Sequence, residues 1–181
     1  MIPFTQKIKA LTVVENKTYS KEVLNNTVRM WRFFEKKVVF TNGCFDILHR
    51  GHIDYLAKAS DLGNELIIAV NSDASVKRLE KGNSRPLQDE QTRAMVLASL
   101  HFVSAVIIFD EETPFELINF LKPDVLVKGA DYDSSETNPL SKKYIVGSDV
   151  VKANGGEVKT IEFLEGFSTT LIEEKIKNFN K

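Results

Sequence analysis

Short apolar runs alternate with amphipathic segments along most of the chain. From Lys37 onward, runs rich in Val and Ile are separated by segments in which apolar residues recur at spacings of three and four positions. Short continuous apolar runs are typical of strands that are buried on both faces of a parallel sheet. The pattern predicts strands at residues 38–41, 65–70, 105–109, 124–127 and 157–163.

The segments between these strands predict helices. Thr113, Pro114 and Glu116 form a helix-start signature, with a hydroxyl cap, a proline in the first turn and a carboxylate that can reach back to the cap. Helices are expected near residues 52–62, 74–79, 90–100, 114–121, 146–153 and 169–178. The alternation indicates an α/β fold, a Rossmann-like open parallel sheet with helices on both faces.

The amino-terminal region differs from the rest of the chain. Residues 1–35 contain no glycine, and an apolar stripe at helical spacing is formed by Val23, Leu24, Val28, Trp31 and Phe34. We therefore expect an N-terminal helical extension at residues 1–35, packed on the domain or on a partner subunit. Residues 36–181 are expected to form the α/β domain.

Composition and charge narrow the class of protein. A chain of 181 residues that is 43% hydrophobic can bury one core without disulfides or a structural zinc. Its 24 basic and 25 acidic residues give a net charge of −1, so we expect no nucleic-acid partner and no anionic membrane surface. Cys44 is the single cysteine, which excludes an intramolecular disulfide and is typical of a cytoplasmic protein.

The longest uncharged stretch, residues 94–109, is too short and too polar for a membrane span. It is interrupted by Ser99, His101 and Ser104, and we interpret it as a helix that leads into a strand, with His101 in the core. The apolar residues after Lys7 and Lys9 are likewise too few for a signal-peptide core. We therefore expect neither a membrane partner nor secretion.

Polar segments follow most of the predicted strands. Residues 42–52 follow the first strand, residues 71–73 the second, residues 128–131 the fourth and residues 165–170 the fifth. Ligands of open α/β sheets bind outside the carboxyl ends of the strands. Because those ends meet at one edge of a parallel sheet, the segments predict a single site assembled from several loops.

His49 and His52 are the strongest candidates for chemistry. They lie three positions apart around Gly51, so they share a face at the amino end of the expected helix. Gly43 allows a tight turn and a close approach of backbone amides to a ligand. Two imidazoles, unpaired helix N–H groups and the helix dipole together favour a bound phosphate.

Competing motifs find less support. No Gly-x-Gly-x-x-Gly follows a predicted strand and no Gly-x-x-x-x-Gly-Lys-Ser/Thr occurs, which disfavours a dehydrogenase or a P-loop ATPase. Zinc binding is the other interpretation of His49 and His52, but their spacing is not that of His-Glu-x-x-His and no third ligand is evident.

Hydroxyl and basic residues supply further candidates. Ser168, Thr169 and Thr170 precede the last expected helix, where one hydroxyl can cap the helix and others can bind phosphate. Lys128 ends a predicted strand and can present its ammonium group inward. Arg93 is either a phosphate clamp or a surface ion pair. A basic cluster, which is either solvated surface or within reach of a polyphosphate, comprises Lys77, Arg78, Lys81 and Arg85.

Two segments carry a resemblance to a known superfamily. Residues 41–52, Thr-Asn-Gly-Cys-Phe-Asp-Ile-Leu-His-Arg-Gly-His, resemble the signature of the cytidylyltransferase-like nucleotidyltransferases, whose hallmark is His-x-Gly-His. Residues 166–170, Gly-Phe-Ser-Thr-Thr, resemble the second signature of that superfamily. Residues 70–73, 84–86, 127–132 and 154–158 are similar to the D-glycero-D-manno-heptose 1-phosphate adenylyltransferases, and the likeness covers about residues 37–177.

The resemblance implies an enzyme with ATP and a sugar 1-phosphate as its partners. Residues 36–181 would be a nucleotidyltransferase domain that makes ADP-heptose and pyrophosphate from ATP and heptose 1-phosphate, for lipopolysaccharide or another surface glycan. His49 and His52 would contact the triphosphate and stabilise the transition state, and Lys128 would approach the reacting phosphates. The implied nucleotide-binding residues are Asn42, Gly43, Cys44, Phe45, Asp46, Gly51, Lys77, Lys81, Arg93, Gly129, Asp131, Ser168, Thr169 and Thr170.

The resemblance also implies a cofactor and an assembly. Mg²⁺ would bridge phosphate oxygens of the nucleotide with few protein ligands, so no metal-ligating residue is expected. Members of the superfamily are commonly dimeric, and we expect a homodimer.

Three positions depart from the family patterns. Phe163 stands where glycerol-phosphate cytidylyltransferases carry an arginine, which disfavours CTP as the substrate. Ala130 and Glu80 depart from the heptose branch at local contacts. The alternatives that stay open are a cytidylyltransferase for glycerol or polyol phosphate and a nucleotide-sensing module without turnover.

Overall fold

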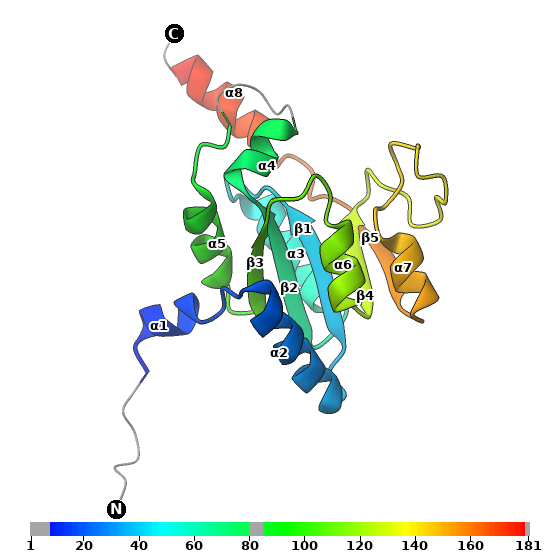
Figure 1. Cartoon of the computed structure of the whole chain (residues 1–181). Helices are drawn as coiled ribbons and strands as arrows, with labels where there is room; N and C mark the ends of the chain where they lie inside the picture. The colour runs from blue at the N-terminus through cyan, green and yellow to red at the C-terminus, as the bar shows by residue number, and fades with distance from the viewer. Residues whose placement is uncertain (1–7, 80–84, 180–181) are drawn as a thin grey trace, which may run out of the picture.

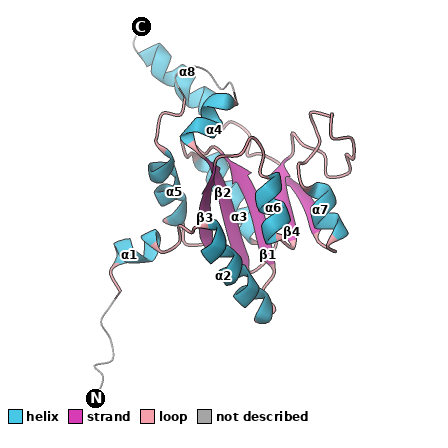
Figure 2. Cartoon of the chain, viewed as in Figure 1, coloured by secondary structure: helices cyan, strands magenta, loops and turns pink. Residues whose placement is uncertain are grey.

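Five parallel strands form one sheet in the order β3-β2-β1-β4-β5. The computed structural model describes residues 8–79 and 85–179. All five predicted strands are present, and the α/β fold class is confirmed (Figures 1 and 2). The strands are β1 (Val38–Gly43), β2 (Glu65–Asn71), β3 (Ala105–Phe109), β4 (Val125–Gly129) and β5 (Glu157–Ile161).

Helices cover both faces of this sheet. One face packs against α2 (Lys21–Phe33), α6 (Phe115–Leu121) and α7 (Ser148–Ala153), and we call it the α6 face. The other face packs against α3 (Arg50–Ser60) and α5 (Glu90–Ala98), and we call it the α3 face. Figure 1 shows α4 (Asp73–Arg78) and α8 (Thr169–Phe179) at one end of the sheet and α1 (Ala10–Glu15) toward the other.

Side-chain alternation along β1 builds both cores at once. Val38 and Phe40 are fully buried against the α6 face, whereas Val39 is fully buried against the α3 face. Successive residues of a strand point to opposite faces of the sheet, so both faces are apolar at residues 38–40 of β1. The same alternation decides the face to which each residue at the end of the strand points.

The amino-terminal extension packs on the sheet. The helix α2 buries Leu24 and Val28 completely on the α6 face, as the apolar stripe predicted, but Val23 and Phe34 of that stripe are exposed. Between α1 and α2 the chain pairs with the edge strand β3, because Thr18 forms a parallel bridge with Val106. This pairing shields the backbone of an edge strand that would otherwise be open to aggregation. The sequence pattern did not predict α1.

One prediction about the core is wrong. His101 is exposed, because α5 ends at Ala98 and the following residues turn at the surface before β3 begins. Val103 is the buried member of that turn. The uncharged stretch 94–109 therefore contains a surface loop between α5 and β3, which its hydropathy did not predict. Among the described residues, no helix is both long enough and apolar enough to cross a membrane.

The packing of α2 can be tested by truncating one buried side chain. We expect Leu24→Ala to lower the free energy of unfolding by about 2–5 kcal/mol, because it removes buried methyl groups and leaves a cavity. Val23→Ala, at a neighbouring position that is 54% exposed, should change it by less than about 0.5 kcal/mol. Urea unfolding measures both. Equal losses in the two variants would show that α2 is not packed on the sheet.

Candidate active site

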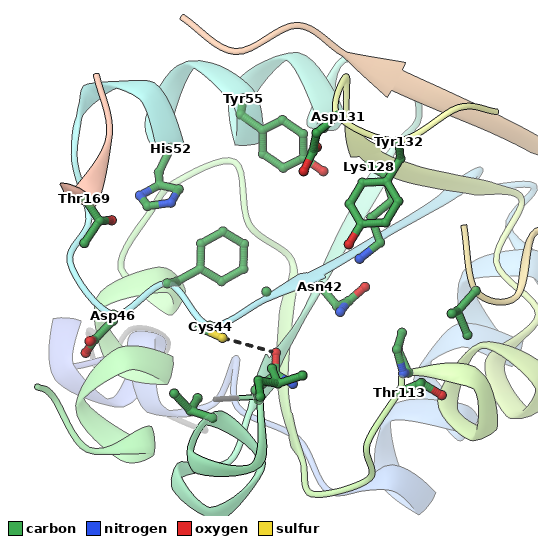
Figure 3. A pocket seen from close by; sticks show the side chains of 18 of the residues that line it. Asn42, Cys44, Asp46, His52, Tyr55, Thr113, Lys128, Asp131, Tyr132 and Thr169 are labelled. Atoms are coloured by element: carbon green, nitrogen blue, oxygen red, sulfur yellow. Dashed lines mark hydrogen bonds between the residues drawn. The ribbon is translucent and has the colours of Figure 1, made fainter. Parts of the chain in front are cut away.

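A cavity of about 500 Å³ lies at the carboxyl edge of the sheet (Figure 3). Residues from the end of β1, from α3, from the loop after β4 and from the start of α8 line it, as the sequence predicted for one shared site. The predicted residues that line it are Asn42, Gly43, Cys44, Phe45, Asp46, His52, Lys128, Gly129, Asp131 and Thr169.

Two stacked histidines mark the start of α3. The rings of His49 and His52 are 3.9 Å apart between centroids and 25° from parallel. His49 is the residue that precedes the first helical turn, and its side chain caps no backbone amide. The first-turn N–H groups of α3 therefore supply donors and a partial positive charge next to both rings.

The two rings are held in the neutral form. Burial, followed by the neighbouring His49 ring, lowers the pKa of His52 to about 4, against the raising effect of a backbone hydrogen bond with Ile47. Burial also lowers the pKa of His49. The Nδ1 atoms of both rings are buried and have no hydrogen-bond partner within the described part of the chain. A bound anion would give these atoms a partner and favour the charged form of each ring.

The segment before α8 meets this helix start, although it is far away in the sequence. His52 and Thr169 line the same cavity, and His49 and Ser168 line an adjoining cavity of about 270 Å³. A Cβ atom added at Gly51 would lie 3.1 Å from Cβ of Phe167, so the glycine permits the close approach. The two signature segments therefore converge.

The three hydroxyl residues of that segment have different positions. The Oγ of Ser168 accepts a hydrogen bond from the Leu171 amide at 3.1 Å and so caps α8. Thr169 faces the large cavity, whereas Thr170 is exposed and lines neither cavity. The structure brings the first two residues to the site and leaves the third at the surface.

Arg93 lies behind the cavity wall and not in the cavity. Its guanidinium group is fully buried and donates to the carbonyl oxygens of Cys44 at 2.7 Å and Gln88 at 3.0 Å, and to the carboxylate of Asp73 at 2.7 Å. Neither interpretation from the sequence, a phosphate clamp or a surface ion pair, describes this position. Arg93 braces the turn after β1 from inside the protein.

Asp46 is a second internal brace. It is 4% exposed and accepts hydrogen bonds from the Leu87 amide at 2.8 Å and from the Gln88 amide at 3.0 Å. Arg85 approaches it at 3.5 Å and also pairs with Glu173 of α8. This network ties the turn after β1 to the segment before α5 and to α8.

Among the described members of the basic cluster, Lys77 and Arg78 do not line the cavity, and Arg78 pairs with Asp110. Lys77 is exposed on α4. Lys81 lies outside the described residues, as does Glu80. Arg85 does line it.

The wall near β4 is aromatic as well as basic. The ammonium group of Lys128 lies 5.3 Å from the ring centroid of Tyr132, which is a cation–π distance. A Cβ atom at Gly129 would overlap the ring of Phe163, so any other residue there would require this ring to move. The sequence reasoning missed Tyr132.

Tyr55 was also missed, although a signal for it existed. It lies three positions after His52 and therefore on the same face of α3. Its hydroxyl lies 2.8 Å from Oγ1 of Thr41 in a buried hydrogen bond. Burial raises the pKa of Tyr55, so the phenol is neutral at physiological pH.

The acidic residues of the cavity wall are too few to hold a metal ion by themselves, but they fit a metal that is coordinated mainly by a bound nucleotide. They are Asp46, Glu112 and Asp131, and Asp46 already binds two backbone amides. Within the described ranges, no group of three or more His, Cys, Asp or Glu side chains could hold a metal ion. Magnesium coordinated mainly by phosphate oxygens fits this donor set.

Comparison with known proteins identifies the family. The sequence model described as Cytidylyltransferase-like matches residues 40–175. The chain belongs to the cytidylyltransferase-like family. The matched segment includes the two stacked histidine rings at the start of α3.

The relatives include much longer proteins. The chain is 54% identical over 164 residues to the Bifunctional protein HldE of Campylobacter jejuni subsp. jejuni serotype O:6, covering 91% of this chain and 32% of the relative. It is 50% identical over 163 residues to the Bifunctional protein HldE of Wolinella succinogenes, covering 90% and 32%. The chain thus spans about a third of the length of these curated relatives.

Solved structures share the fold of this cytidylyltransferase-like chain. The lipopolysaccharide core biosynthesis protein of Thermoplasma volcanium has a TM-score of 0.55 and 27% identity, covering 71% of this chain and 97% of that one. Pantoate-beta-alanine ligase of Francisella tularensis has a TM-score of 0.53 and 14% identity, covering 91% and 78%, which shows the fold alone.

The depressed pKa of His52 predicts a pH effect on stability. The unfolded chain takes up a proton near pH 6.5 and the folded chain only near pH 4, so the free energy of unfolding should fall as the pH drops between these values. In His52→Gln this part of the loss should disappear. Urea unfolding of both proteins at pH 7.5 and pH 5 measures the difference. Identical losses in both proteins would contradict the assigned pKa.

Proposed function

We propose that this domain transfers AMP from ATP to D-glycero-D-manno-heptose 1-phosphate, giving ADP-heptose and pyrophosphate. The observation that carries the proposal is the meeting of His52 and Thr169, from the two signature segments, around one cavity. The relatives named HldE and the lipopolysaccharide core biosynthesis protein support a role in surface-glycan synthesis. The similarity of residues 127–132 and 154–158 to the heptose branch selects the acceptor.

The proposed reaction needs no covalent enzyme intermediate. An oxygen of the sugar phosphate attacks the α-phosphorus of ATP, a new P–O bond forms, and pyrophosphate leaves with the electrons of the broken bond. The task of the protein is then to align two anions and to stabilise the charge that develops. Magnesium, when bound, neutralises part of the phosphate charge.

The residues of this chain divide that task. The rings of His49 and His52 donate N–H groups to the triphosphate, and charge on the phosphates raises the pKa values that burial has lowered. The first-turn amides of α3 point at the same charge. Thr169 closes the nucleotide side, and Lys128 holds the reacting phosphates.

Two finer features complete the proposal. The reaction takes place in the cytoplasm, which agrees with a single unpaired cysteine, Cys44. The chain acts as a homodimer, as is common in the superfamily, and analytical ultracentrifugation of the purified chain tests this.

The activity itself is tested with purified protein. We expect pyrophosphate to be released from ATP and magnesium in the presence of heptose 1-phosphate, and to a much smaller extent when CTP replaces ATP or glycerol 3-phosphate replaces the sugar. A coupled phosphate assay measures the release. A preference for CTP would show a cytidylyltransferase, and tight ATP binding without turnover of any acceptor would show a sensing module.

The histidines provide a sharper test. We expect His49→Ala and His52→Ala each to lower kcat by about 10² or more, the scale of losing one donor to a charged transition state. His101→Ala is the matched control, because His101 is exposed and far from the cavity wall in sequence and in the fold. Its kcat should equal that of the unaltered chain. An unchanged kcat in either active-site variant would remove that histidine from the mechanism.

A further inference from the structure

The cavity straddles the edge of the sheet, and its two sides belong to different faces. In β1, Phe40 packs on the α6 face and Val39 on the α3 face. By alternation, Thr41 points to the α3 face, where it bonds Tyr55, and Asn42 points to the α6 face. In β4, Leu126 lies on the α6 face, so Lys128 points to that side as well.

The side toward α3 is built for the nucleotide. It carries His52, Thr169 and the start of α3, which are the groups that the proposed function assigns to the triphosphate. The rings of Tyr55 and Phe163 lie 6.2 Å apart between centroids on this side. Aromatic surfaces of this kind suit a flat base.

The side toward α6 is chemically different. It combines an amide, two hydroxyl groups and a carboxylate with one ammonium group, which is a donor and acceptor set suited to a phosphorylated polyol. Figure 3 shows Asn42 and Lys128 on the part of the cavity toward Thr113, away from His52 and Thr169. The residues that line this side are Asn42, Glu112, Thr113, Lys128, Tyr132 and Val146.

Asn42 carries the clearest signal for a ligand. Its Oδ1 atom is buried and accepts no hydrogen bond within the described residues, although the side chain lines the cavity. A buried acceptor without a donor is costly. Phosphate oxygens at neutral pH cannot donate to it, whereas a sugar hydroxyl can.

We propose that the α6 side of the cavity is the acceptor subsite, in which Asn42 reads a hydroxyl of the sugar. This inference rests on the proposed function and adds the residues that select the sugar phosphate. Lys128 attracts the phosphate to the edge of the sheet. The carboxylate of Glu112 repels the phosphate and accepts hydrogen bonds from hydroxyl groups of the sugar. The sugar ring therefore points toward the loop before α6, where the Thr113 hydroxyl makes a second contact with it.

The assignment is tested by measuring KM for each substrate separately. We expect Asn42→Ala and Thr113→Val each to raise KM for the sugar 1-phosphate by about tenfold at saturating ATP, the effect of one lost hydrogen bond. KM for ATP should change by less than about twofold. Asn26→Ala is the matched control, because it truncates an exposed asparagine on α2 that does not line the cavity, and it should leave KM for the sugar 1-phosphate unchanged.

The outcomes separate this inference from the proposed function. If the unaltered chain turns over heptose 1-phosphate but Asn42→Ala and Thr113→Val raise KM for ATP and not for the sugar, the acceptor subsite is wrong and the reaction stands. If another sugar phosphate is the substrate, the proposed acceptor is wrong, and an unchanged KM for that sugar phosphate in both variants would overturn the acceptor subsite as well. If no acceptor is turned over, both proposals fail. Thr113 is exposed on a loop, so Thr113→Val keeps the test valid should Asn42→Ala not fold.

Discussion

The site depends on one close approach, at which the chain around Phe167 crosses the first turn of α3. Gly51 makes this possible, because a Cβ atom there would lie 3.0 Å from the His49 ring and 3.1 Å from Phe167. Phe167 in turn lies under the Arg50 guanidinium group, 5.3 Å from its ring centroid. Without this crossing, Thr169 and His52 would not share a cavity, and the donors that we propose for the phosphates would come from one segment only.

Polar groups around this crossing fall into two classes, those without a hydrogen-bond partner and those with several hydrogen bonds. Within the described residues, the buried Nδ1 atoms of His49 and His52 have no hydrogen-bond partner, which opposes folding and leaves both atoms available to an anion. Asp46 and Arg93, immediately behind the cavity, have several hydrogen bonds each. If Asp46 and Arg93 lacked their hydrogen bonds, nothing would fix the turn after β1 in one conformation next to the unpaired imidazoles. The ion pairs of Arg85 with Asp46 and of Arg93 with Asp73 therefore hold the turn after β1 in place.

The sequence predicted the features that depend on local pattern. The strands, the polar segments after them and the histidine pair follow from periodicity and short motifs, and the parallel sheet then brings the segments to one edge. Features that depend on tertiary burial were not predictable in this way. Arg93 is polar yet fully buried, and His101 sits in an apolar run yet is exposed. Tyr55 could have been found from its spacing to His52, and Tyr132 from its place at the end of the segment 127–132 that is similar to the heptose branch.

The two faces of the sheet also bear on the in-line transfer that we propose. The attacking oxygen and the departing pyrophosphate must lie on opposite sides of the α-phosphorus. At the end of β1, Thr41 bonds Tyr55 on the α3 face and Asn42 points to the α6 face, where it lines the cavity, so one strand reaches both sides at its carboxyl end. If the triphosphate is held by α3 and the acceptor by the α6 side, the α-phosphorus lies between them over the strand. In the proposed reaction, the alternation that packs both cores would thus also set the direction of attack.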